Sequence, residues 1–147
     1  MNMKKIKTIF IIVIIVIGSI IFYNKFIKRT PETLLKKNFD IELNDFDYSI
    51  ETFKDEWNFN ESRFLIIFKF DTLTVKNIEY LKSKGLEPLP ISKDRLPYIS
   101  GTPKHFSTTE NGYYIGKFNP EYIKDFVIFI VDVKAKKALL YHESLGF

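Results

Sequence analysis

An uncharged apolar run near the N-terminus constrains this chain more than any other feature. The run covers fifteen residues, from Ile9 to Tyr23, and basic residues flank it on both sides. The flanking residues are Lys4, Lys5 and Lys7 before the run and Lys25, Lys28 and Arg29 after it. A membrane-spanning helix needs about 20 mostly apolar residues, and flanking lysines can extend the run by reaching back to the lipid headgroups. We therefore predict one transmembrane helix, with residues 6–27 contacting the lipid bilayer, inside an anchor of residues 1–29.

A cleaved signal peptide is the alternative interpretation, because it also has a basic start and a short apolar stretch. It requires small residues before the cleavage site, whereas Gly18 and Ser19 are followed by large apolar residues. An uncleaved signal-anchor fits this pattern better. The positive charges on the two sides of the run are nearly balanced, and large following domains are translocated largely regardless of such charges. We expect a single-pass membrane protein with its domain outside the cytoplasm.

The net charge of +4 arises in the anchor and not in the domain that follows. Six of the 22 basic residues precede residue 31, while all 18 acidic residues follow it, so residues 31–147 carry a net charge of −2. A nucleic-acid-binding domain presents a basic patch or stripe, and we therefore expect no nucleic-acid partner. The chain has no cysteine, which excludes a disulfide framework, thiolate chemistry, a cysteine zinc site and a lipidated cysteine.

Residues 30–147 are enough for one soluble domain with its own hydrophobic core. Thr30 predicts a helix start, since a hydroxyl N-cap is followed by Pro31 at the first helical position. Thr74 predicts a second helix, which Gly85 ends. In this second helix we expect Val75, Ile78 and Leu81 to share the apolar face that packs on a sheet.

Strand patterns occupy much of the remaining domain. Apolar residues alternate with polar ones after Asn44, which predicts a strand with one face in water. Further strands are predicted at Phe64–Phe70, Gly112–Phe118, Phe126–Val133 and Ala138–Glu143, with a turn at Lys54–Ser62 and a short helical turn at Asn119–Lys124. The fold class we predict is α+β, a small, mainly antiparallel sheet of four to six strands with one or two packed helices.

The first predicted strand carries the acidic residues Asp45, Asp47 and Glu51. Acids at alternate positions resemble the start of a calcium-binding loop, but the glycine and the spaced glutamate of such a loop are missing. One interpretation is a solvated strand face. The other is an acidic surface for a basic partner or a cation.

Glu87–Asn111 is a long irregular segment that holds four of the six prolines. Loops of this length in compact domains are usually functional or disordered, and its aromatic residues argue against disorder. The segment is locally basic through Lys93, Arg95, Lys104 and His105. We predict that these four residues contact a protein partner.

Neither histidine, His105 nor His142, has a metal-ligand neighbour at helical or strand spacing, and we find no phosphate-binding loop or nucleophile motif. We therefore predict no catalytic, metal or cofactor-binding residue, and a binding or interaction module rather than an enzyme. A structural cell-envelope or assembly subunit is one alternative. A membrane-tethered enzyme is another, and it would need a histidine and a carboxylate within hydrogen-bond reach in a pocket.

Overall fold

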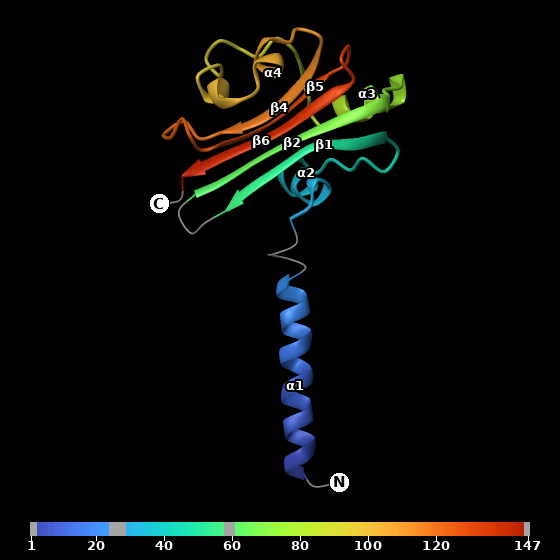
Figure 1. The fold of residues 1–147 in the computed structure, drawn as a ribbon, viewed down its shortest axis with the longest axis vertical. Coiled ribbons are helices and arrows are strands. Elements are labelled where there is room, and N and C mark those ends of the chain that lie inside the picture. The colour runs from blue at the N-terminus through green and yellow to red at the C-terminus, as the bar shows by residue number, and fades with distance from the viewer. Residues whose placement is uncertain (1–2, 24–28, 58–60, 146–147) are drawn as a thin grey trace.

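The computed structural model describes residues 3–23, 29–57 and 61–145, and Figure 1 shows their arrangement. Helix α1 (Met3–Phe22) stands apart from the sheet. Its large apolar side chains expose 46–66% of their surface, from Ile6 onwards and on every side of the helix. In the described ranges, no helix has the length and apolarity needed to cross a membrane. The last part of the predicted span, residues 24–27, lies outside the described residues.

The domain is built on a six-stranded sheet, which confirms the predicted α+β class. The strand order is β1-β2-β6-β5-β4-β3, and each neighbouring pair is antiparallel. The strands are β1 (Asp47–Trp57), β2 (Glu61–Thr72), β3 (Glu87–Pro88), β4 (Gly112–Phe118), β5 (Phe126–Asp132) and β6 (Lys137–Leu145). Every residue of β5 is buried, as expected for a central strand covered on both faces.

Two helices cover one face of the sheet. Helix α2 (Pro31–Phe39) begins after Thr30 and helix α3 (Val75–Ser83) begins after Thr74, and both threonine side chains accept a hydrogen bond from the third residue of their helix. These are the N-caps that the sequence predicts. The apolar sides of both helices pack on the sheet in one large core. The prediction for Val75 is wrong: its side chain is 76% exposed, because as the first residue of α3 it lies beyond the apolar side that Leu81 buries.

The irregular segment Glu87–Asn111 covers the opposite face of the sheet, where Figure 1 shows α4 (Lys104–Thr108) on the side away from α2. It contains a short 3₁₀-helix at Tyr98–Gly101. Ile91, Ile99 and Phe106 expose 7%, 1% and 3% of their surface and form a second core with β4, β5 and β6. The segment is therefore a packed layer of the fold.

Two local predictions are wrong. Strand β1 continues to Trp57 and β2 starts at Glu61, so most of the predicted polar turn belongs to a strand pair; cross-strand pairing outweighs the weak strand preference of its charged residues. Residues 119–125 form hydrogen-bonded turns and no helix. The backbone N–H groups of Tyr122 and Asp125 each donate to the carbonyl three residues earlier, at 3.3 and 3.0 Å, which is the hydrogen bond of a turn.

Candidate functional site

The predicted contact residues fall into two groups at different places on the sheet. Lys93, Arg95, Lys104 and His105 belong to the irregular segment, whose Arg95 contacts β3 and β4. Asp45, Asp47 and Glu51 lie just before or along β1, at the other edge of the sheet. The structure therefore offers two separate surfaces and not one combined site.

His105 lies beside a buried carboxylate that the sequence analysis missed. Its Nε2 is 3.0 Å from Oδ2 of Asp132, the last residue of β5, whose side chain is only 5% exposed. The Thr109 hydroxyl donates to the same oxygen at 2.7 Å, and the backbone N–H of Ala135 donates to Oδ1 at 2.8 Å. Asp132 thus joins the irregular segment to the turn between β5 and β6. Its only signal in the sequence is an acid at the end of a wholly apolar run.

The His105–Asp132 pair opens onto a shallow depression of about 590 Å³. A carboxylate on one imidazole nitrogen can orient the ring so that the other nitrogen takes up a proton. A nucleophilic enzyme of this type also needs a hydroxyl or thiol beside that nitrogen. The two threonine hydroxyls of the depression have other acceptors: Thr109 donates to Asp132, and Thr108 donates to the Lys104 carbonyl at 2.9 Å. This geometry fits a structural contact that holds the segment to the sheet better than it fits a catalytic pair.

Arg95 is held in place by the sheet. Its Nη1 donates to the Tyr114 hydroxyl at 3.2 Å and lies 3.7 Å from Oε2 of Glu87. Its guanidinium group also lies over the rings of Tyr114 and Phe118, at 5.9 and 5.4 Å from their centroids. Lys93 and Lys104, by contrast, have exposed side chains. Of the basic residues in the segment, these two lysines are the ones best placed to meet a partner.

The acidic residues near β1 are only partly neutralised. Lys137 Nζ binds both carboxylate oxygens of Glu51, at 2.7 and 2.8 Å, and Arg29 Nε lies 2.9 Å from Oδ2 of Asp55. For Asp45 and Asp47, the described part of the chain provides no ion-pair partner, and both side chains are exposed. This edge therefore retains a negative surface.

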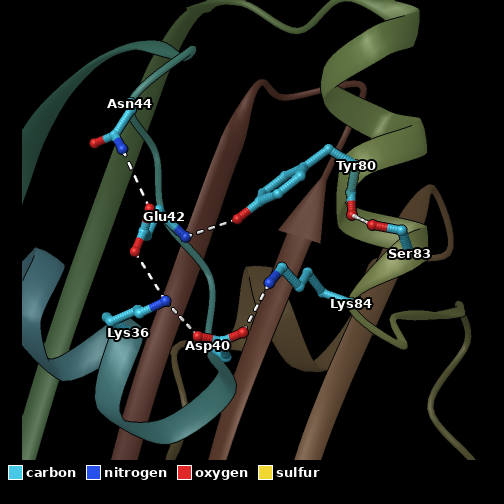
Figure 2. A network of polar contacts seen from close by, with 7 residues as sticks. All are labelled: Lys36, Asp40, Glu42, Asn44, Tyr80, Ser83 and Lys84. Carbon is cyan, nitrogen blue, oxygen red and sulfur yellow. Dashed lines mark hydrogen bonds and ion pairs between the residues drawn. The ribbon is translucent and has the colours of Figure 1, made fainter.

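A second group of charges joins α2 to α3, as Figure 2 shows. Lys36 binds both Asp40 and Glu42, and Lys84 Nζ lies 2.8 Å from Asp40 Oδ2. Hydrogen bonds from Lys36 and Lys84 lower the pKa of Asp40 to about 2. The Tyr80 hydroxyl also accepts from the Glu42 backbone N–H at 2.9 Å. Two depressions adjoin the network. The one beside Tyr80 holds about 160 Å³, less than the roughly 300 Å³ at which small-molecule sites begin, and an open one of about 450 Å³ lies beside Lys36 and Glu42. We assign this network to helix packing.

His142 has a structural environment. Its Nδ1 lies 3.0 Å from the Phe126 carbonyl oxygen, the arrangement in which Nδ1–H donates to that carbonyl. The imidazole stacks on the Phe64 ring with 4.9 Å between centroids, and burial lowers the pKa of His142. In the described residues, no group of three or more histidine or carboxylate side chains is arranged to hold a metal ion.

Comparison with protein-family models gave no match to this chain, and comparisons with curated proteins and with solved structures gave none either. The assignment of function therefore depends on the chain's own surfaces.

Proposed function

We propose that the chain is a membrane-anchored interaction module whose domain lies outside the cytoplasm. The observation that carries this proposal is the exposure of α1. The large apolar side chains from Ile9 to Tyr23 are roughly half exposed, while the domain forms its two apolar cores without them. Burying one such side chain is worth about 1.5–3 kcal/mol. A lipid bilayer would bury all of them at once.

In the sequence, apolar residues continue beyond the fifteen uncharged ones, with Ile6 before the run and Phe26 and Ile27 after it. At 1.5 Å per residue the fifteen uncharged residues extend about 22 Å, whereas the hydrocarbon core of a bilayer is about 30 Å thick. The proposed span adds these flanking residues of the sequence to the run, with Lys7 and Lys25 able to reach the headgroups. The bilayer is therefore the first partner we propose, through residues 6–27.

Interaction is the role that the domain's surface supports best. Lys93 and Lys104 are exposed on the irregular segment, and Asp45 and Asp47 are exposed near β1. The 3.0 Å contact between His105 and Asp132 favours the membrane-tethered enzyme as the second candidate, ahead of the structural subunit. A structural envelope subunit, the third candidate, would use neither surface for a specific partner.

Membrane extraction tests the anchor. The full chain should stay in the membrane pellet after an alkaline carbonate wash, and Ile11→Lys with Ile15→Lys should release it because two charges would enter the hydrocarbon. Val75→Lys with Leu96→Lys is the matched control, since it adds two lysines at exposed apolar positions of the domain, 76% and 41% exposed. Release of the unmodified chain by carbonate would refute the anchor.

A further inference from the structure

Strand β1 is a long strand at the edge of the sheet. It has eleven residues and pairs on one side with β2, and no strand of the described chain pairs with its other side. The opposite edge, β3, has only two residues. The backbone N–H and C=O groups along an open edge can pair with a further strand from another chain.

The second half of β1 has the regular geometry that such pairing requires. The register shifts between Ile50 and Thr52, and from there Thr52–Trp57 pairs residue for residue with β2. Phe53 is 42% exposed although it is aromatic, and Lys54 and Glu56 are exposed as well. A strand added here would meet an apolar ring and charged side chains on its neighbour.

The charge along β1 indicates what kind of strand fits. The strand carries one basic residue, Lys54, against four acids, Asp47, Glu51, Asp55 and Glu56. Arg29 and Lys137 neutralise two of these acids. The other two, Asp47 and Glu56, lie near the two ends of the strand and form no ion pair within the described residues, although Arg63, which binds Glu143, lies opposite Glu56 on β2. A second copy of this chain would bring a further acidic edge against them. A basic strand would complement them.

We propose that the outer edge of β1, Thr52–Trp57, binds an extended basic segment of a partner protein by strand addition. This inference rests on the proposed interaction function and specifies the partner for its acidic surface. Main-chain hydrogen bonds would supply affinity, and lysine or arginine side chains at alternate positions of the partner would supply selectivity.

Amide hydrogen exchange on the full chain in phosphatidylcholine nanodiscs tests this proposal, with the peptide Lys-Val-Lys-Val-Lys-Val-Lys as the probe. We expect alternate backbone amides within residues 52–57 to exchange more slowly when the peptide is present, because successive N–H groups of a strand point to opposite sides. Glu56→Gln and Asp47→Asn should each weaken binding about 1.4- to 5-fold, the range of single exposed charge pairs. Glu110→Gln is the matched control and should leave affinity unchanged.

A peptide with proline in place of its central valine keeps the charge but cannot pair as a strand. Protection by this peptide, protection only outside residues 52–57, or no protection by either peptide would overturn the proposal. Slow exchange at residues 52–57 without peptide, together with dimers, would show that a second copy occupies the edge and would also overturn it. Loss of the protein from the nanodiscs with peptide binding retained would refute the anchor alone.

Discussion

The two faces of the sheet are covered by different kinds of structure. On one face α2 and α3 pack their apolar sides, and both helices begin at threonine N-caps that are visible in the sequence. On the other face an irregular segment supplies single buried residues, Ile91, Ile99 and Phe106. The comparison teaches that a segment rich in proline can form a layer of the core with only short regular elements, provided that several contacts hold it to the sheet.

The polar contacts that hold the segment to the rest of the domain are distributed along its length. Arg95 donates to Tyr114 on β4, the Tyr98 hydroxyl donates to the Asn119 carbonyl at 3.3 Å, and His105 and Thr109 bind Asp132 on β5. A segment held in this way presents Lys93 and Lys104 on a defined surface. A disordered loop would have to be ordered on binding, at a cost in affinity.

Replacing Phe106 by alanine should have the largest effect on stability. If the segment is a true core layer, we expect a loss of about 3–5 kcal/mol in the free energy of unfolding, as for a buried phenylalanine in any core. Urea unfolding of the full chain in detergent micelles measures this loss. A loss below about 1 kcal/mol, the level of ordinary surface changes, would show that the segment adds little to the fold.

Leu81→Ala measures the corresponding loss in the free energy of unfolding for the face of the sheet that α2 and α3 cover. Leu81 is completely buried beneath α3, and its truncation should cost about 2–5 kcal/mol. The same unfolding experiment applies. If Leu81→Ala were far more damaging than Phe106→Ala, the helices alone would stabilise the domain and the comparison of the two faces would fail.

Asp132→Ala should have a smaller effect that is localised in the segment. The change leaves the Thr109 hydroxyl and the Ala135 N–H without their acceptor, which costs about 1–3 kcal/mol when such groups are buried. Amide hydrogen exchange should quicken in α4 before the rest of the domain opens. Lys134→Ala, at an exposed neighbouring position, is the control. Unchanged amide hydrogen exchange in α4 would show that Asp132 does not hold this helix in place.

His142, which lies on β6, should make the free energy of unfolding depend on pH. Its pKa is lowered in the folded state by burial, so below a pH of about 6.5 the unfolded chain takes up the proton more readily. Stability should therefore fall as the pH drops from 7.5 to 5.5. His142→Asn should reduce this dependence in urea unfolding at the two pH values, whereas a full dependence in that variant would point to another group.

The regular parts of this fold could be predicted because their signals are local. Thr30 and Thr74 mark helix starts within four residues, and the apolar run from Phe126 marks a buried strand. The partners of Asp132 could not be predicted: Thr109 is 23 residues away in sequence, and only the packing of the segment brings the two together. The length of β1 could not be predicted for the same reason, because pairing with β2 and not local preference extends the strand.

The crossing of a membrane by α1 is the claim on which the account depends, and cysteine labelling measures it most directly. The chain has no cysteine, so Asn2→Cys before the helix and Ser100→Cys on the irregular segment each introduce a single thiol. With a membrane-impermeant thiol reagent, we predict that Ser100→Cys is labelled on intact cells and Asn2→Cys only after lysis. Labelling of both positions on intact cells, or of both only after lysis, would contradict a helix that spans the membrane.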